Sequence, residues 1–223
     1  MTAMVKICGL SDAAALEAAL TAGADMVGFV FFPKSPRHVS FEAARRLGAQ
    51  ARGRARIVAL SVDASDEALE RIVAALDPDI LQLHGRERPE RVREIKARFG
   101  RAAMKAVGVA AREDLAAAAR YEAAADFILI DAKPPREAAL PGGNGRPFDW
   151  PLASGFAARR PWLLSGGLDP GNVAEAIALT RARGVDVSSG VESAPGVKDP
   201  GKIRTFVAAA REAFARLAER ETT

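Results

Sequence analysis

The length, composition and charge of the chain restrict the classes of protein to which it can belong. Its 223 residues, of which 49% are hydrophobic, suffice for one α/β domain with one core, since barrel domains commonly contain roughly 200–250 residues. The lone Cys8 excludes an intramolecular disulfide. No apolar run approaches the roughly 20 residues of a membrane span. The first residues also lack the basic segment followed by an apolar run that is typical of a secretory signal peptide. We therefore expect a cytoplasmic protein without a membrane partner.

The net charge of +4 does not by itself indicate nucleic acid. The arginines are spread over the whole chain and stand beside alanine and glutamate, for example in 42–46 and 91–94. Nucleic-acid-binding proteins instead cluster their basic residues on one face or along one helix. We interpret these arginines as solvated helix faces and expect no nucleic-acid partner, although the surplus positive charge would help to attract an anionic metabolite.

Short apolar runs alternate with longer Ala-, Glu- and Arg-rich stretches of helical period, which is typical of repeated βα units around a parallel sheet. The predicted strands are Met4–Cys8, Met26–Phe31, Arg56–Val62, Ile80–Leu83, Ala102–Val107, Asp126–Asp131, Trp162–Ser165 and Val185–Ser188. The predicted helices are Asp12–Ala22, Phe41–Ala51, Asp66–Leu76, Pro89–Phe99, Arg112–Tyr121, Pro151–Ala158, Pro170–Arg183 and Pro200–Leu217.

Eight strands, each followed by a helix, favour closure into a (β/α)8 TIM barrel, with residues 1–223 forming a single domain. Suitable N-cap residues precede five of the helices: Ser11, Ser40, Ser65, Asp169 and Asp199. One long loop, rich in proline and glycine, is expected from Ala132 to Pro147. A loop of that length in a compact domain is usually functional or mobile.

Several ionisable side chains are expected to point into the barrel. Because side chains alternate along a strand, the apolar Val5 and Ile7 lie under the helices, so Lys6 and Cys8 face inward, with Cys8 at the C-terminal rim. The same reasoning selects the polar residues of the other strands, namely Gln82, His84, Lys105, Asp131, Asp186 and Ser188. A buried charge needs a partner, so we expect Asp186 to neutralise Lys6 or Lys105 and leave Cys8 and Asp131 available for chemistry.

Two glycine-bearing turns at the end of the chain suggest a phosphate site. Gly166 and Gly167 follow the seventh predicted strand, and Ser189 and Gly190 follow the eighth. In barrels, backbone N–H groups at these two places commonly bind a phosphate. A glycine pair alone is usually only a turn, but the two turns together favour a small phosphorylated substrate.

Six ordered motifs then make the sequence more specific. They are Lys6-Ile7-Cys8-Gly9, Gly28-Phe29-Val30-Phe31 with Pro33-Lys34-Ser35-Pro36-Arg37, Leu81-Gln82-Leu83-His84-Gly85, Phe148-Asp149-Trp150, Leu164-Ser165-Gly166-Gly167-Leu168, and Asp186-Val187-Ser188-Ser189-Gly190-Val191-Glu192. With them the chain resembles the phosphoribosylanthranilate isomerases of tryptophan biosynthesis, from the first strand to the loop after the eighth.

This resemblance implies an Amadori rearrangement of N-(5-phosphoribosyl)anthranilate. It further implies that Cys8 is the general base, that Asp131 is the general acid, and that Arg37 binds the anthranilate carboxylate. Gly166, Gly167, Ser189 and Gly190 would then bind the phosphate. For this chemistry we expect the pKa of Asp131 to be raised, and the pKa of Cys8 to be lowered toward neutrality, in part by Lys6.

Other interpretations stay open at this point. Cys8 could be a small buried hydrophobic residue, Asp131 a turn residue, and His84 with Gln82 a hydrogen-bonded group behind the site, like Lys6 and Asp186. The protein could instead be another phosphate-binding barrel enzyme, such as an indole-3-glycerol-phosphate synthase, or a non-catalytic phosphate- or nucleic-acid-binding module. Two histidines and one cysteine offer no zinc ligand set. We expect no metal and no cofactor, and either a monomer or a homodimer.

Overall fold

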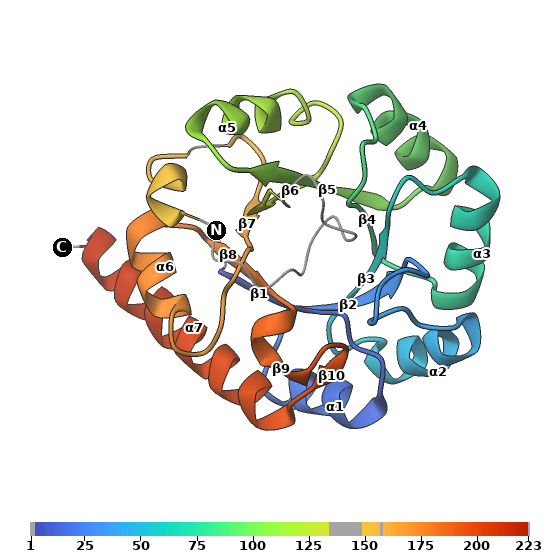
Figure 1. Ribbon diagram of the computed structural model, residues 1–223, viewed down its shortest axis with the longest axis horizontal. Coiled ribbons are helices and arrows are strands. Elements are labelled where there is room, and N and C mark those ends of the chain that lie inside the picture. Colours follow the sequence, from blue (N-terminus) through green and yellow to red (C-terminus); the bar gives the residue numbers. More distant parts are fainter. Residues whose placement is uncertain (1–2, 134–148, 157, 223) are drawn as a thin grey trace.

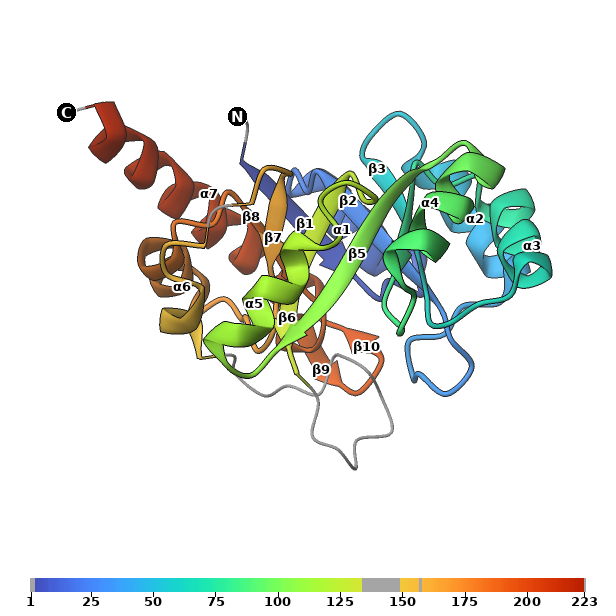
Figure 2. The ribbon, with the colours of Figure 1, turned by 90° about the horizontal axis from the view of Figure 1, so that it is seen from above.

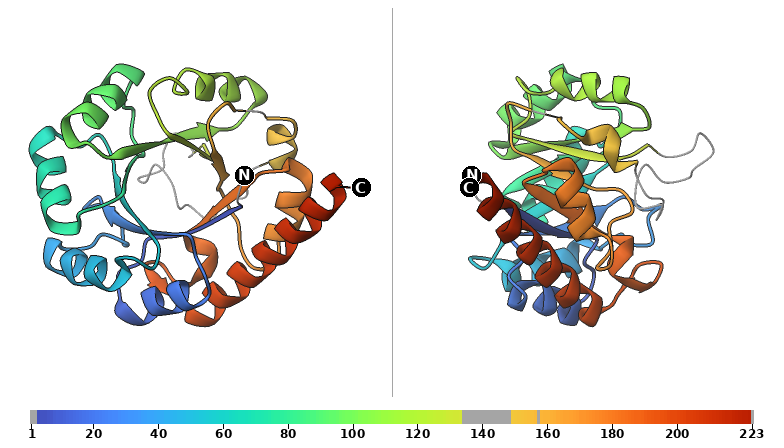
Figure 3. Two further views of the ribbon diagram at one scale, coloured as in Figure 1. Left: turned by 180° about the vertical axis from the view of Figure 1, so that it is seen from behind. Right: turned by 90° about the vertical axis from the view of Figure 1, so that its left-hand side faces the viewer.

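The computed structural model describes residues 3–133, 149–156 and 158–222, and within them the chain forms a closed barrel of eight strands (Figure 1). The strands follow each other around the ring in sequence order, and each pairs in parallel with its neighbours. Helices surround the ring (Figures 1 and 3). The predicted (β/α)8 barrel is therefore confirmed.

The strands agree with the predicted ones to within two residues at each end, which is the usual scatter of such boundaries. They are β1 (Met4–Cys8), β2 (Met26–Phe31), β3 (Arg56–Ser61), β4 (Ile80–Leu83), β5 (Ala102–Val109), β6 (Phe127–Ala132), β7 (Trp162–Leu164) and β8 (Gly184–Val187). The helices are α1 (Ala13–Thr21), α2 (Phe41–Ala51), α3 (Asp66–Leu76), α4 (Pro89–Phe99), α5 (Arg112–Ala119), α6 (Val173–Thr180) and α7 (Pro200–Thr222).

Side-chain caps fix where several helices begin. Ser40 accepts a hydrogen bond from the N–H of residue 43, and Ser65 from that of residue 68. Asp199 likewise accepts from two N–H groups in the first turn of α7. At α1 the prediction of Ser11 was wrong, because the neighbouring Asp12 accepts from the N–H of residue 15 at 2.8 Å. Each cap satisfies a backbone donor that the helix itself cannot pair.

The chain around β7 departs most from prediction. In place of the predicted helix Pro151–Ala158, a short 3-10 helix, η1 (Trp150–Ala153), is found, and Gly155 has a φ of +76°, which ends helical geometry. Helix α6 begins at Val173 and not at Pro170, since Asp169 accepts from the N–H groups of Gly171 and Asn172 and holds a turn there. The N-cap of α6 is Asn172, so the prediction of Asp169 as a helix N-cap was wrong.

After β8 the chain forms elements that were not predicted. A second short 3-10 helix, η2 (Ser189–Val191), leads into a hairpin of β9 (Glu192–Ala194) and β10 (Val197–Lys198). Figure 2 shows this hairpin at the opposite end of the barrel from the N-terminus, where the strands of a parallel barrel end. Helix α7 then packs against α1 and α6 and completes the outer layer. None of the helices among the described residues is long and apolar enough to span a membrane.

The inside of the barrel changes character along its axis. Its lower part is an apolar cluster of Met4, Met26, Val58, Ile80, Met104, Ala106, Leu129 and Leu163. Toward the carboxyl ends of the strands the buried residues become polar, beginning with Lys6, Gln82, Asp131 and Asp186. Active sites of barrel enzymes lie at this end, so the apolar lower part forms a floor beneath the candidate site.

Candidate active site

The deepest polar contact inside the barrel joins Lys6 on β1 to Asp186 on β8. These residues are opposite each other in the strand register, and Lys6 Nζ lies 2.8 Å from Asp186 Oδ1, with both side chains buried. Burial by itself would lower the pKa of Lys6, but the charge and hydrogen bond of Asp186, with the neighbouring Cys8, outweigh it and raise that pKa. Of the two partners predicted for Asp186, the structure selects Lys6.

Lys105 does not point into the barrel, so its predicted inward orientation was wrong. On β5 the side chains of Met104 and Ala106 belong to the inner cluster, and Lys105 lies between them on the outer face. There its Nζ donates to Glu87 at 2.8 Å and to the carbonyls of Leu83 and Gly85. Lys105 is thus a buried structural cation outside the ring of strands.

Cys8 ends β1 directly above Lys6 and is 4% exposed. Burial raises the pKa of the Cys8 thiol, while Lys6 and Lys198 act in the opposite direction without overcoming it. The expectation of a lowered pKa was therefore wrong. Gly28 on β2 makes room for this arrangement, because a Cβ atom there would lie 3.0 Å from Cys8 Sγ and 3.3 Å from Lys6 Nζ.

Asp131 stands on β6 at the same level of the barrel mouth and is 5% exposed. Its Oδ2 lies 3.2 Å from Nε2 of His84, and Nδ1 of His84 lies 3.1 Å from Nε2 of Gln82. The Oδ1 atom accepts from the N–H of Ala132 at 2.8 Å. Gln82 and His84 thus form a hydrogen-bonded chain that ends on Asp131 and fixes the direction of its carboxyl group. Gln82 Oε1 is buried and has no hydrogen-bond partner among the described residues.

Arg37, from the loop between β2 and α2, lies over the end of β1. A Cβ atom on Gly9 would lie 2.7 Å from Arg37 Cδ and 3.1 Å from Ser188 Oγ, so glycine at position 9 lets the arginine cross the mouth next to Cys8. The guanidinium is buried and bound to Glu192, with Nε 2.7 Å from Oε1 and Nη2 2.9 Å from Oε2. The structure therefore brings Arg37 into the same site as Cys8.

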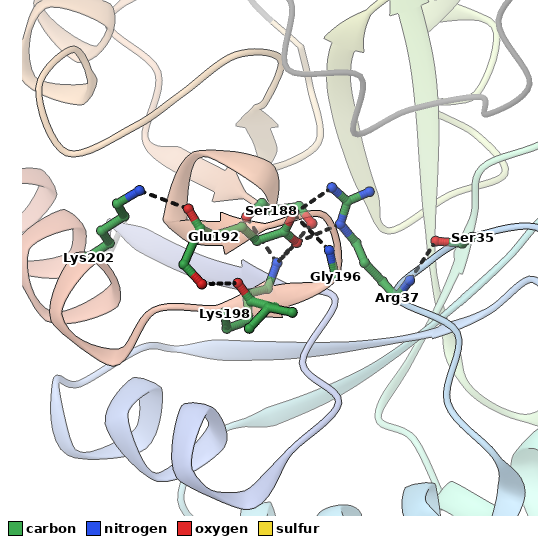
Figure 4. Close-up of polar contacts among 9 residues, drawn as sticks. Ser35, Arg37, Ser188, Glu192, Gly196, Lys198 and Lys202 are labelled. Atoms are coloured by element: carbon green, nitrogen blue, oxygen red, sulfur yellow. Dashed lines mark hydrogen bonds and ion pairs between the residues drawn. The ribbon is translucent and has the colours of Figure 1, made fainter.

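Glu192 and Lys198 were not singled out from the sequence, although both are buried at the barrel mouth (Figure 4). Lys198 Nζ donates to Glu192 Oε1 at 2.7 Å and to the carbonyl of Ser188 at 2.9 Å. Burial would raise the pKa of Glu192, but Arg37 and Lys198 outweigh it and lower that pKa. Burial lowers the pKa of Lys198, even though Glu192 opposes this. Glu192 at least belongs to a recognisable motif, whereas Lys198 carries no sequence signal.

The two glycine-bearing turns are in contact with each other. A Cβ atom on Gly190 would overlap the carbonyl oxygen of Leu168, so the turn after β8 packs directly on the turn after β7. Gly166 and Gly167 have φ values of +84° and +72°, which only glycine adopts readily. Within the described ranges, the N–H groups of Gly166, Gly167, Ser189 and Gly190 donate to no other residue of the chain. Such neighbouring backbone donors suit an anion.

Two further predictions concern a metal ion and the long loop after the sixth strand. Among residues 3–133, 149–156 and 158–222, no group of three or more His, Cys, Asp or Glu side chains could hold a metal ion. The predicted loop from Ala132 to Pro147 lies outside the described residues from position 134 onward.

Fold and site together define a (β/α)8-barrel enzyme, with ionisable groups gathered at the carboxyl ends of its strands. A family model described as N-(5'phosphoribosyl)anthranilate (PRA) isomerase matches residues 5–209. The chain belongs to this family, as its sequence motifs indicated.

Individual relatives agree with this assignment. The N-(5'-phosphoribosyl)anthranilate isomerase of Rhodopseudomonas palustris strain HaA2 is 63% identical over 211 residues, which cover 95% of this chain and 97% of the relative. That of Nitrobacter winogradskyi is 59% identical over 219 residues, covering 98% and 97%.

Solved structures of the family superpose well. The phosphoribosyl anthranilate isomerase of Thermotoga maritima is 38% identical, with a TM-score of 0.84 over 95% of this chain and all of the other. A structure in complex with reduced 1-(o-carboxyphenylamino)-1-deoxyribulose 5-phosphate is 36% identical, with a TM-score of 0.79 and the same coverage.

Proposed function

We propose that this protein catalyses the Amadori rearrangement of N-(5-phosphoribosyl)anthranilate to 1-(2-carboxyphenylamino)-1-deoxyribulose 5-phosphate in tryptophan biosynthesis, with Cys8 as general base and Asp131 as general acid. The observation that carries the proposal is the position of these two side chains. Cys8 is the last residue of β1, and Asp131 is the last but one of β6. These strands are three strand steps apart around the ring and lie on different sides of the barrel (Figure 1).

The first step opens the sugar ring. Asp131, carrying a proton, gives it to the ring oxygen while the bond from that oxygen to C1 breaks, and the nitrogen lone pair forms a protonated imine with C1. The contact between His84 and Asp131 holds the carboxyl group in one orientation during this transfer. Asp131 is left as a carboxylate.

The second step removes the proton from C2, which the positive imine has made acidic. The Cys8 thiolate takes it, and the electron pair moves toward nitrogen to give an enolamine. Ketonisation then adds a proton at C1 and releases one from the 2-hydroxyl group. Substrate and product are isomers, and the proton gained by Cys8 balances the one lost by Asp131.

Lys6 and Lys198 support the base. Both act to lower the pKa of Cys8 against the effect of burial, so they stabilise the thiolate when it forms. A thiolate whose pKa is raised by burial is also a stronger base once it exists. We propose in addition that the turns at Gly166-Gly167 and Ser189-Gly190 bind the phosphate, and that Arg37 binds the anthranilate carboxylate.

The test compares native protein with the variants Cys8→Ala and Asp131→Asn. Each should lower kcat by roughly 10²–10⁴-fold, the contribution of one proton-transfer group, while the Kd for the reduced product analogue changes little. A fluorescence assay on N-(5-phosphoribosyl)anthranilate measures turnover, and isothermal titration measures binding. Glu17→Gln, which alters a surface ion pair with Arg54, is the control and should behave like native protein.

Turnover of Asp131→Asn at the native rate would assign the acid to another group. Release of carbon dioxide from a carboxylated substrate would indicate the ring-closing synthase reaction instead, because the isomerisation releases none. Binding of single- or double-stranded nucleic acid that weakens steeply with salt would favour the non-catalytic module.

A further inference from the structure

Glu192 connects three parts of the barrel mouth. It follows the phosphate turn at Ser189-Gly190, begins β9, and binds Arg37 from the loop after β2 (Figure 4). One carboxylate oxygen also accepts from Lys198 at 2.7 Å, and the other accepts from the N–H of Gly196 at 3.2 Å. Nothing in the acid–base steps uses this buried carboxylate.

The contact with Arg37 has a defined direction. Glu192 occupies the edge of the guanidinium formed by Nε and Nη2, in the bidentate geometry that holds such a group most firmly. This contact fixes the plane of the guanidinium, and with it the direction from which an incoming carboxylate can meet Arg37. Because the Arg37 side chain crosses Gly9 next to Cys8, its orientation decides where such a carboxylate lies relative to the base.

The charges of this cluster are unequal. Arg37 and Lys198 are two buried cations, and both bind the carboxylate of Glu192. Asp186, deeper in the barrel, is bound to Lys6. Among the described residues, two buried cations thus meet at one carboxylate, which favours an anionic ligand at this place.

The backbone supports the same contact. A Cβ atom on Gly196 would lie 2.5 Å from the carbonyl oxygen of Pro36, so the hairpin of β9 and β10 packs closely on the residue before Arg37. Gly196 has a φ of +83° and turns the hairpin toward that loop. The hairpin that follows the phosphate turn thereby packs against the loop that carries Arg37.

From this arrangement we propose that Glu192 is a positioning residue, which holds Arg37 in the one orientation that binds the aryl carboxylate of the substrate. Lys198 in turn holds the Glu192 carboxylate. The hairpin of β9 and β10 fixes the distance between Glu192 and the phosphate turn. The proposal rests on the proposed role of Arg37. Glu192 itself does not touch the reacting atoms.

The test measures a ratio of two dissociation constants. One ligand is reduced 1-(2-carboxyphenylamino)-1-deoxyribulose 5-phosphate, and the other is the same molecule with hydrogen in place of the carboxyl group. Native protein should prefer the carboxylated ligand by about 100-fold, as expected for a bidentate charged contact. Arg37→Ala should reduce this preference to within about threefold, and Glu192→Gln should reduce it by about tenfold or more.

The ratio separates positioning from mere folding, since a smaller folded fraction weakens both ligands equally. Glu17→Gln, which changes a comparable arginine–glutamate pair on the surface, should leave the ratio as it is in native protein. If Glu192→Gln does not fold because two buried cations lose a carboxylate partner, the double variant Glu192→Gln/Lys198→Met removes one of the two cations as well. It should show the same reduced preference.

The outcomes distinguish the two proposals. Loss of preference in both Arg37→Ala and Glu192→Gln supports the positioning role. Loss in Arg37→Ala with a native ratio in Glu192→Gln, or in the double variant, overturns it while leaving Arg37 in the site. A native ratio in Arg37→Ala would show that Arg37 does not bind the carboxylate. The proposed role of Glu192 would then be overturned as well.

Discussion

Two buried lysine–carboxylate pairs lie on opposite sides of the same sheet. Lys6 and Asp186 meet inside the barrel, and Lys105 and Glu87 meet outside it, both with a distance of 2.8 Å. Lys105 also donates to two backbone carbonyls, and Glu87 accepts from the N–H groups of Asp63 and Gly85. The outer pair thus fastens the loops after β3 and β4 to β5.

The inner pair is bonded more sparsely. Among the described residues, the side chain of Lys6 donates a hydrogen bond to Asp186, and the thiol of Cys8 lies close enough for the two groups to shift each other's pKa. A buried cation that donates all its hydrogen bonds to backbone carbonyls and a structural carboxylate stabilises the fold. A buried cation beside a reactive thiol can also stabilise the thiolate. The two pairs have equal length, so the difference in role comes from the neighbours and not from the salt bridge.

The largest expected effect tests the outer pair. Lys105→Met should lower the free energy of unfolding by about 3–5 kcal/mol, because it leaves the Glu87 carboxylate buried without its cation. Urea denaturation measures this loss. The kcat/KM of the folded variant should match that of native protein, and a drop as large as that of Cys8→Ala would show that the outer pair serves the chemistry as well.

A smaller effect tests the inner pair. Lys6→Met removes a cation that acts to lower the pKa of Cys8, so this pKa should rise further. At neutral pH kcat/KM should fall by about tenfold, equivalent to ~1.4 kcal/mol. The rate of Cys8 alkylation by iodoacetamide against pH reports the thiolate, and its midpoint should move to higher pH. In the matched variant Lys105→Met the midpoint should stay in place; equal shifts in both variants would contradict the comparison.

The smallest effect is a dependence of stability on alkaline pH. Cys8 and Lys6 both have raised pKa values, so the folded protein keeps protons that the unfolded chain has already released. Their stabilising contribution is therefore complete below the ordinary pKa of the thiol and declines as pH rises toward the folded pKa values. For one group the slope cannot exceed about 1.4 kcal/mol per pH unit. Denaturation of Cys8→Ala at increasing pH should show a flatter decline, and an unchanged slope would refute the assignment.

The same two lysines show what the sequence could predict. On β1 the alternation was readable, because Val5 and Ile7 are apolar while Lys6 and Cys8 are not. On β5 the residues on both faces around Lys105 are apolar, since strands of a parallel barrel are buried on both sides. The pattern could therefore not show which way Lys105 points, and Glu87 stands in a loop where periodicity carries no information.

Elements and motifs were predictable to different degrees. All eight strands followed from short apolar runs, whereas the helix expected after residue 150 was replaced by η1, because Gly155 ends the helical geometry. The hairpin of β9 and β10 escaped prediction, since strands of two or three residues are too short to show alternation. The direction of the Cys8 pKa also escaped it, because the sequence shows the nearby cation but not the complete burial.

The interlocking of the hairpin with the loop of Arg37 bears on how this barrel can be recombined with its relatives. Gly196 fits against Pro36, and Glu192 binds Arg37, so residues 33–40 and 188–198 form one module although they are far apart in the chain. A chimera that exchanges only one of these segments inherits half of a matched interface. Grafting a new substrate preference onto this scaffold therefore calls for transplanting both segments together.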